Sequence, residues 1–420
     1  PNAADKRKAQ QPDSWEEYTE EMGKYCIQDV ELNADVYFKL LKQAENFSQE
    51  SIDLEHAVAK IVKEQEQNGF MLDEKKATLL AAKLNSKMSE IEKKVHETFK
   101  PKWVDDKLVT PKLRKDGTLS KVGLTNEEMS KCLKTNNFKP FMRQKWATFN
   151  LGSRKQIGEY LVDFGWKPAK FTPTGQPIVD ETTLEKVKDI PEATLIAEFM
   201  MLQKRVAQVS SWLELSKESR VHGFVISNGA ITGRMTHRNP NVAQTPSSSK
   251  PYGKECRECW TVPKGYKLVG VDASGLELRV LAHYMKNKEY VNEIINGDIH
   301  STNQSLAGLG SRSQAKTFIY ALIYGAGDAK IGSVVGGNAK AGATLRSSFI
   351  RNLPSLGNLT NAVERTAQTR KYVKALDGRV IHIRKVYSAL NTLLQGGGAV
   401  IMKTALVLLY NKIKELELDA

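Results

Sequence analysis

Three side chains that suit a bound polyphosphate follow one another at four-residue intervals: Arg312, Lys316 and Tyr320. This spacing puts them on one face of a helix. Cations near a helix N-terminus add to the positive end of its dipole, which favours phosphate oxygens. A tyrosine one turn further along would face a sugar or base. Taken alone, a pair of cations at this spacing more often marks only an exposed cationic helix face.

Both ends of this helix are indicated by local signals. Ser311 followed by Gln314 has the form of a capping box, so we expect the helix to start there. Gly325 is a natural C-terminal stop, because glycine adopts the left-handed conformation that ends many helices.

Asp272 is the carboxylate placed to hold a metal ion near such a phosphate. It follows Lys267–Val271, a short, apolar, valine-rich run that predicts a buried strand. Oxygen ligands suit hard cations such as Mg²⁺, and the end of a strand presents them well. The alternative is that Asp272 only caps the helix expected after Ser274–Gly275.

Composition narrows the class of protein. The 420 residues are enough for two to four domains, and a net charge of +14 favours a polyanionic partner such as nucleic acid. Four cysteines do not make a disulfide framework, although Cys256 and Cys259 have the spacing of half a zinc site. No apolar run reaches transmembrane length, so we expect a cytoplasmic protein without a membrane partner.

A basic stretch from about 99 to 146 interrupts the helical patterns. Aromatic residues such as Trp103 and Trp146 stand among its lysines and arginines. Two interpretations stay open: a flexible element that touches the backbone of a nucleic-acid duplex, or a solvated insertion.

Four other elements are predicted from local patterns. Asn228-Gly229 predicts a hairpin turn within Phe224–Ile231, and Asp377-Gly378 predicts another, of type I′. A long helix is expected over about 191–219. Gln395 with Gly396 to Gly398 should open a strongly apolar final helix.

The stretches around Asp272 and Arg312 resemble motifs A and B of the Pol I-like (family A) DNA polymerases. They read Asp-x-Ser-x-x-Glu-x-Arg and Arg-x-x-x-Lys-x-x-x-Tyr-x-x-x-Tyr-Gly. The resemblance is closest to the replicative polymerases of T-seven-like bacteriophages and runs over nearly the whole chain. Further matching stretches are TGRMTH around Gly233-Arg234, Asn241 to Gln244, Gly297 to His300, Leu376 to Arg379 and Asn391 to Gln395.

This resemblance implies an α/β (α+β) chain with the right-hand polymerase fold, in which a helical thumb and fingers surround an antiparallel palm sheet. The implied segments are a remnant of a 3′–5′ exonuclease domain (1–48), a thumb (49–225) with the basic insertion at about 99–146, a palm with motif A (226–290), fingers (291–390) with the motif B helix at about 311–324, and a return to the palm (391–420).

The same resemblance assigns the roles of the catalytic and nucleotide-binding residues. It implies that Asp272 and the Ala273 carbonyl hold two Mg²⁺ ions, with Mn²⁺ as a substitute. Arg312, Lys316 and His300 would neutralise the triphosphate of the incoming dNTP.

Three further residues would surround the sugar and base of that nucleotide. Tyr320 would stack near them, and Tyr324 would lie at the template side. Glu277 would crowd the 2′ position and so reject ribonucleotides.

For primer-template DNA, the resemblance implies contacts from Arg234, Gln395 and Arg279. Many relatives have a histidine where this chain has Tyr387, which removes one expected minor-groove contact. Host thioredoxin is a further expected partner, as a processivity factor, although the insertion does not resemble the one that binds it.

Tyr25 and Asp29 resemble the third motif of the exonuclease. The chain begins after the earlier exonuclease carboxylates, so we expect it not to proofread by itself. It also stops before the His-Asp-Glu-like turn that carries the family's second catalytic aspartate. We therefore expect an abbreviated polymerase, or one piece of a split polymerase that needs a C-terminal companion polypeptide.

The predicted function is DNA-templated DNA synthesis by two-metal phosphoryl transfer in phage replication. Two rival classes stay open: a non-catalytic module that binds primer-template, and a single-subunit RNA polymerase. Glu277 argues against the second, because a bulky side chain beside the sugar suits deoxynucleotides.

The identity of residue 320 generates a direct prediction. Relatives with tyrosine at this position accept dideoxynucleotides, so Tyr320→Phe should lower that acceptance while leaving dNTP incorporation in place. Competition between dideoxynucleotides and dNTPs during primer extension measures the effect. Chain termination that is unchanged in the variant would count against the assignment of Tyr320.

Overall fold

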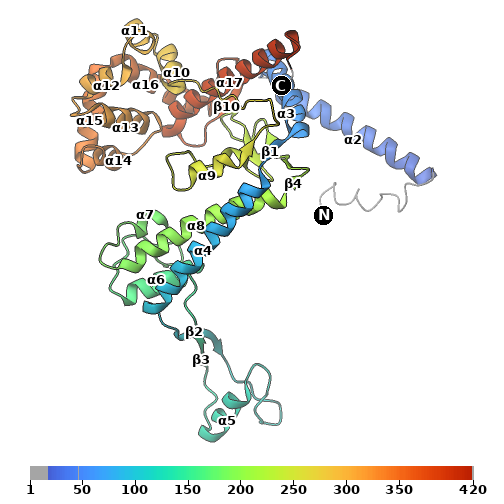
Figure 1. Ribbon diagram of the computed structural model, residues 1–420, viewed down its shortest axis with the longest axis vertical. Helices are drawn as coiled ribbons and strands as arrows, with labels where there is room; N and C mark the ends of the chain where they lie inside the picture. Colours follow the sequence, from blue (N-terminus) through green and yellow to red (C-terminus); the bar gives the residue numbers. More distant parts are fainter. Residues whose placement is uncertain (1–17, 46, 419–420) are drawn as a thin grey trace. The chain divides into compact units, whose positions relative to one another are not determined.

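The computed structural model describes residues 18–45 and 47–418 and combines helices with short antiparallel strands (Figure 1). This confirms the prediction of an α+β chain. The chain forms two compact units. Unit 1 contains the described residues up to Gly69, Gly223–Asn239 and those from Val269 onward, and unit 2 contains Phe70–His222 and Pro240–Leu268. Parts of the predicted segments 1–48 and 391–420 lie outside the described residues.

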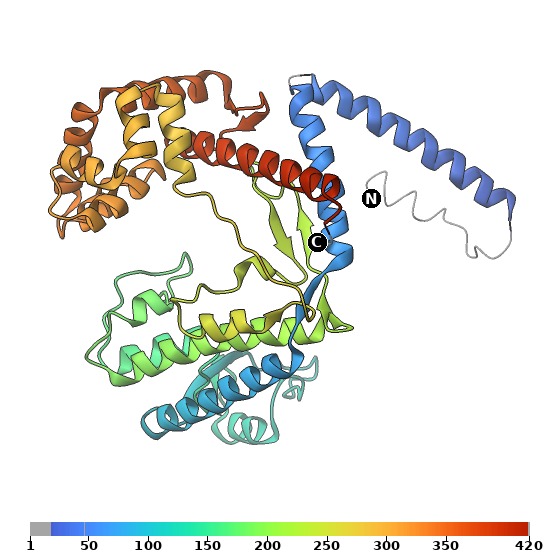
Figure 2. The same ribbon diagram turned by 45° about the horizontal axis from the view of Figure 1, so that its top comes forward.

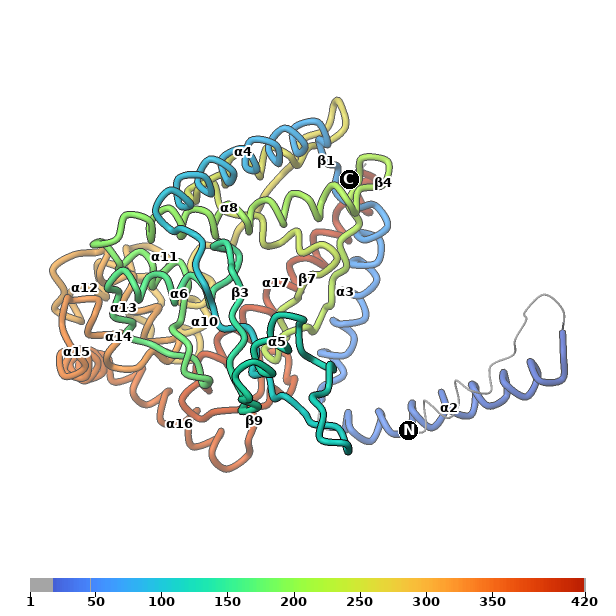
Figure 3. Tube along the Cα trace, turned by 90° about the horizontal axis from the view of Figure 1, so that it is seen from below, coloured from blue at the N-terminus to red at the C-terminus, as the bar shows by residue number. Residues whose placement is uncertain are grey.

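Unit 2 is built on two long helices, α4 (Glu74–Thr98) and α8 (Pro191–Glu214), which pack side by side (Figure 3). The apolar stripe predicted on α8 lies in the core, where Leu202 and Val209 are fully buried. The helix ends earlier than the predicted position 219, because Glu218 and Ser219 have positive φ angles and turn the chain into a hairpin. The other elements outside the basic insertion are α6 (Arg154–Asp163), α7 (Glu181–Leu184), a short 3₁₀ turn (Val242–Gln244), α9 (Gly253–Glu258) and a sheet in the order β4 (Ser216–Lys217), β5 (Arg220–Val221), β1 (Phe70–Leu72) and β8 (Trp260–Thr261).

The basic insertion of unit 2 is not the loop expected from its sequence. Its strands β2 (Lys102–Val109) and β3 (Phe141–Ala147) form an antiparallel ladder, and α5 (Asn126–Thr135) lies in the connection between them. Trp103 and Trp146 are direct partners on this ladder, with ring centroids 5.6 Å apart. Cross-strand aromatic pairing stabilises a ladder that charge content alone does not predict.

Unit 1 is organised around α17 (Ala389–Glu415), which contacts α3 (Gln49–Asn68), α10 (Leu276–Met285) and α16 (Pro354–Arg370) (Figure 2). Its other helices are α2 (Glu20–Ala44), α11 (Lys288–Asn296), α12 (Ile299–Ala307), α13 (Arg312–Ile323), α14 (Asp328–Ser333), α15 (Ala339–Asn352) and a short 3₁₀ turn (Val386–Ser388). Its strands form two hairpins, β6 (Phe224–Ile226) with β7 (Thr236–Arg238) and β9 (Tyr372–Lys374) with β10 (Val380–His382).

The sequence had suggested that three consecutive glycines open α17. They lie inside the helix instead. α17 starts already at Ala389. A Cβ at Gly396 would lie 2.2 Å from Ile381 Cδ1, and one at Gly397 would lie 2.7 Å from Val280 Cγ1. The glycines are therefore where α10 and the β9–β10 hairpin approach the α17 backbone most closely.

One described segment, Val386–Glu415, passes a test for membrane spanning by length and composition, which corrects the expectation that no run would. Half of its most apolar window is buried inside the protein (50%). A core helix of a soluble protein has the same character, and α17 packs in the core of unit 1.

The two predicted hairpins exist, but the first has its turn elsewhere and the second has another turn type. β6 does not pair with the residues that immediately follow Asn228-Gly229. It pairs with β7, so a longer loop, residues 227–235, joins the two strands. In the β9–β10 hairpin Gly378 has φ +79° and Asp377 does not have a positive φ, which rules out type I′. The Asp377 carboxylate instead accepts a hydrogen bond from the Arg379 backbone N–H.

Lys267–Val271 is not the buried strand predicted from its composition. The segment has no strand hydrogen bonding, and Val269 and Val271 are 79% and 82% exposed. A strand needs a neighbour to pair its backbone groups, and no strand within residues 18–45 and 47–418 lies beside this segment. Among the described residues, the antiparallel pairing in the predicted palm segment therefore comes from β6 and β7, and the segment before motif A adds no strand to it.

The close packing at Gly397 predicts a stability effect. Gly397→Ala should lower the free energy of unfolding by about 1–2 kcal/mol, because overpacking costs about 1–3 kcal/mol and alanine recovers up to about 1 through helix propensity. Val280 is buried and stiff at χ1, so it cannot easily move aside.

The measurement is chemical denaturation, with Gly158→Ala in α6 as the matched control. A Cβ at Gly158 meets Pro177 at an ordinary 3.5 Å, so this variant should be neutral or slightly more stable. Equal stability of the two variants would contradict the packing argument.

Candidate active site

The helix that carries Arg312, Lys316 and Tyr320 forms almost within its predicted limits. α13 runs from Arg312 to Ile323, and the Ser311 hydroxyl accepts a hydrogen bond from the Gln314 backbone N–H at 3.2 Å. The capping box is incomplete, because the Gln314 side chain donates to the Val334 carbonyl. Gly325 follows the helix with φ +71°, as a C-terminal stop requires.

Arg312 is held by a carboxylate at the start of α12. Its Nε and one terminal nitrogen donate to the two oxygens of Asp298 at 2.6 and 2.9 Å. These hydrogen bonds, with one from Ser301, hold the pKa of Asp298 well below its usual range. Asp298 also caps α12 by accepting from the His300 backbone N–H. The ion pair therefore links the N-terminus of α12, which Asp298 caps, to the N-terminus of α13, where Arg312 is the first residue.

Lys316, on α13, and His300, on α12, are close enough to this ion pair to interact electrostatically with each other. Lys316 is exposed and has no hydrogen-bond or ion-pair partner within the described residues. Burial lowers the pKa of His300, and the charges of Arg312 and Lys316 lower it further, so its imidazole is neutral near pH 7. Its Nδ1 is buried without a partner in the described part of the chain.

The C-terminal end of α13 meets the first turn of α10. The rings of Tyr320 and Tyr324 lie 6.0 Å apart, and His300 lies 6.3 Å from Tyr320. The Tyr324 hydroxyl donates to Glu277 Oε1 at 3.5 Å. Burial and the Glu277 charge raise the pKa of both tyrosines, so they are neutral. A row of side chains thus runs from cations through aromatic rings to one carboxylate.

A cavity of about 350 Å³ lies beside this carboxylate. Arg234, Glu277, Gln395 and Lys403 contribute its polar lining. The Gln395 amide donates to the side chain of Asn391 at 3.0 Å, which orients it. Two predicted DNA-binding residues, far apart in the sequence, therefore line one space with the predicted sugar-contacting Glu277.

Asp272 stands apart from this row. It is exposed and has no hydrogen-bond or ion-pair partner among the described residues. It does not cap α10 either, because the N-cap residue is Gly275 and no side chain caps the helix. Arg279 donates to the Ser274 carbonyl at 2.9 Å, within its own turn.

The residues expected to hold metal ions do not make a complete site. Within residues 18–45 and 47–418 no cluster of three or more His, Cys, Asp or Glu could hold a cation. Asp272 with the Ala273 carbonyl offers one carboxylate and one backbone oxygen, whereas two ions held about 4 Å apart need more carboxylates.

Two other sequence signals have clear structural outcomes. Tyr25 and Asp29 lie together on α2, where the Asp29 charge and a hydrogen bond raise the pKa of Tyr25. Cys256 and Cys259 are buried in the core of unit 2, and burial raises the pKa of the Cys259 thiol to about 11. The cysteines are core residues and not ligands.

Sequence reasoning gave no role to Asp298, Glu55, Arg379 or Lys403. The signal for Asp298 was present, since an aspartate directly before a helix is a common N-cap. Glu55 and Lys403 carried no such signal, because their partners lie hundreds of positions away.

Comparisons with known proteins identify the family of this chain. A sequence profile described as DNA polymerase family A matches residues 120–420. The DNA-directed DNA polymerase of Escherichia phage T7 is 36% identical, over 93% of this chain and 66% of the relative, and that of Enterobacteria phage T3 gives the same values. DNA polymerase I of Pseudomonas aeruginosa is 27% identical over 65% of this chain and 33% of its own length.

The chain therefore belongs to DNA polymerase family A. It spans about two thirds of the length of the two phage relatives (66%). Among solved structures, the POL domain of Pol1 from M. smegmatis, in complex with DNA primer-template and dNTP, matches with a TM-score of 0.68 at 18% identity. That match covers 87% of this chain and 61% of the other and supports the fold.

Proposed function

We propose that this chain acts in template-directed addition of deoxynucleotides to a primer 3′ end, in phage DNA replication in a bacterial cytoplasm. The observation that carries the proposal is the row along α13, in which Arg312, Lys316 and Tyr320 lead to Glu277 on α10. The cationic end suits a triphosphate, and the aromatic end suits a sugar and base.

The cations supply the electrostatic part of the chemistry. Phosphoryl transfer is accelerated mainly by positioned charges that stabilise the charge developing on the phosphoryl oxygens. Arg312 is already fixed by Asp298, so little reorganisation is needed when the phosphates bind. Lys316 is free to turn toward them, and the neutral His300 can donate a hydrogen bond.

The other end of the row selects the nucleotide. Glu277 and Tyr324 together narrow the space beside the sugar, so a 2′ hydroxyl would meet a carboxylate already engaged with a tyrosine. This arrangement supports deoxynucleotides as substrates and argues against the alternative of a single-subunit RNA polymerase.

Divalent metal is part of the proposal through family membership. Mg²⁺, or Mn²⁺ in its place, would neutralise phosphate charge near Asp272 and the Ala273 carbonyl.

The DNA-binding roles of Arg234, Gln395 and Arg279 are also proposals, as is the five-segment division into exonuclease remnant, thumb, palm, fingers and returning palm. The lysines and arginines of the basic insertion support a contact with a duplex backbone. Thioredoxin as a processivity partner, a C-terminal companion polypeptide and the exonuclease origin of Tyr25 and Asp29 stay predictions.

A second candidate function rests on the isolation of Asp272. A protein with one metal-binding carboxylate would bind primer-template and a nucleotide without turnover. Its affinity for primer-template would fall with salt, because phosphate contacts release counterions.

Primer extension by the chain alone, with Mg²⁺ and dNTPs, distinguishes these functions. Extension that is abolished by Asp272→Ala and that strongly favours dNTPs over rNTPs would support the proposed function. Binding of primer-template without extension, by the unaltered chain, would favour the second function. Equal use of rNTPs would overturn the assignment of a DNA polymerase.

A further inference from the structure

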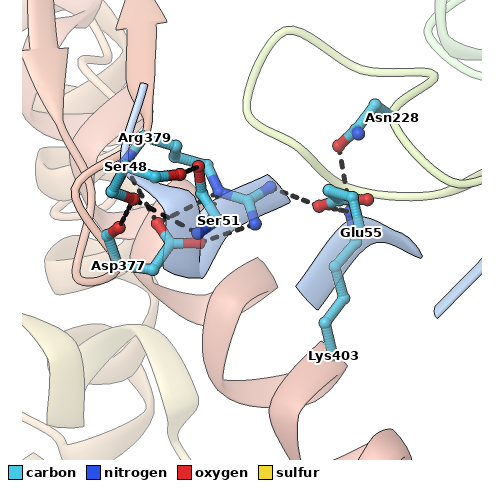
Figure 4. Close-up of polar contacts among 7 residues, drawn as sticks. All are labelled: Ser48, Ser51, Glu55, Asn228, Asp377, Arg379 and Lys403. Carbon is cyan, nitrogen blue, oxygen red and sulfur yellow. Dashed lines mark hydrogen bonds and ion pairs between the residues drawn. The ribbon is translucent and has the colours of Figure 1, made fainter. Parts of the chain in front are cut away.

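A cluster of buried charges lies at the junction of α3, α17 and the β9–β10 hairpin (Figure 4). Lys403 and Arg379 are only 2% and 6% exposed. Lys403 Nζ and Arg379 both donate to Glu55 Oε1, each at 2.5 Å. Arg379 also donates two hydrogen bonds to Asp377 Oδ2, from a terminal nitrogen at 2.7 Å and from Nε at 2.9 Å. We call these four residues the Glu55 cluster.

The Glu55 cluster balances two cations against two carboxylates. Burying an unpaired charge is far more costly than burying a paired one, so every member depends on its partners. Such a network has few alternative arrangements, because each side chain is fixed by more than one hydrogen bond. The three elements that supply its members are therefore held in one geometry.

The cluster also reaches the loop 227–235, which carries Arg234. Lys403 Nζ donates to the Asn228 side-chain oxygen at 2.9 Å (Figure 4). On the other side of the loop, a Cβ added to Gly233 would lie 3.1 Å from an Arg379 terminal nitrogen. Lys403 thus bonds one end of the loop, and the Arg379 side chain lies beside Gly233 near the other end.

Inside the loop, backbone hydrogen bonds transmit these contacts to Arg234. Gly233 N–H donates to the Ala230 carbonyl at 2.9 Å, and Ala230 N–H donates to the Arg234 carbonyl at 3.1 Å. These two hydrogen bonds link Ala230 to both Gly233 and Arg234 across the loop. Arg234 itself is exposed and lines the cavity that Glu277 and Gln395 also line.

We infer that Asn228 and Lys403 are positioning residues: they fix the loop so that Arg234 faces primer-template DNA beside Gln395. This rests on the proposed function, in which Arg234 contacts DNA. Neither positioning residue needs to touch the DNA, and Asn228 would act only through the loop that it anchors.

Asn228 is the residue that separates positioning from stability. It is exposed and contributes one neutral acceptor, so removing it leaves the ion pairs of the Glu55 cluster intact. Changing Lys403 would instead leave a buried carboxylate with one cation fewer and risk unfolding.

The test is the affinity of the full chain for a fluorescent primer-template, measured by anisotropy for a double-mutant cycle of Asn228→Leu and Arg234→Ala. A hydrogen bond to a charged group is worth a factor of roughly ten, so we expect Asn228→Leu to weaken binding by up to about tenfold. In the Arg234→Ala background it should have no further effect, because the two residues act as a unit.

Asn228→Gln is the matched control, since its amide oxygen keeps a neutral acceptor for Lys403. It should restore binding to within about twofold of the unaltered chain, and the thermal unfolding temperature of all variants should stay nearly constant. Independent effects that multiply in the double variant, or unaltered binding by Asn228→Leu, would overturn the inference. An unaltered chain that binds no primer-template would overturn the proposed function, and the inference with it.

Discussion

The constraint on which unit 1 depends is the close approach of other elements to the backbone of α17. At Gly396 and Gly397 the neighbouring Ile381 and Val280 side chains occupy the space that any β-carbon would need. This contact sets the distance between α17 and α10, and α10 begins with the turn that carries Glu277. The position of that carboxylate beside Tyr324 therefore depends on two residues that have no side chain.

The polar contacts of α17 follow from the same packing. Once the glycine face has fixed the helix, Lys403 lies in the interior, where it can stay charged only with a partner such as Glu55. Gln395, closer to the N-terminus of the helix, lines the cavity with Arg234. α17 thus carries both Lys403, which forms the buried ion pair with Glu55, and Gln395, which is proposed to contact DNA.

The sequence predicted best what is decided locally. The limits of α13 were found because Ser311 and Gly325 act within a turn of their own position, and the face of Arg312, Lys316 and Tyr320 follows from helix periodicity. The prediction of a buried strand at Lys267–Val271 was wrong, because a strand needs a neighbouring strand to pair with and no local pattern reveals whether one is there. The prediction of a hairpin turn at Asn228-Gly229 was wrong for a related reason. This loop is anchored by a hydrogen bond from Lys403, which lies 175 residues away in the sequence. The Glu55 cluster was missed because Glu55 and Lys403 are 348 residues apart.

The central claim is that the row from Arg312 to Glu277 binds an incoming deoxynucleotide. The most direct measurement is the affinity for primer-template with each dNTP in turn, using a primer that ends in a dideoxynucleotide so that no chemistry occurs. The next complementary dNTP should tighten binding by roughly fivefold or more, a typical coupling between two ligands, and Lys316→Ala should abolish the gain while Arg351→Ala on α15 should keep it. Equal affinities with all four dNTPs, or a gain that survives Lys316→Ala, would contradict the account.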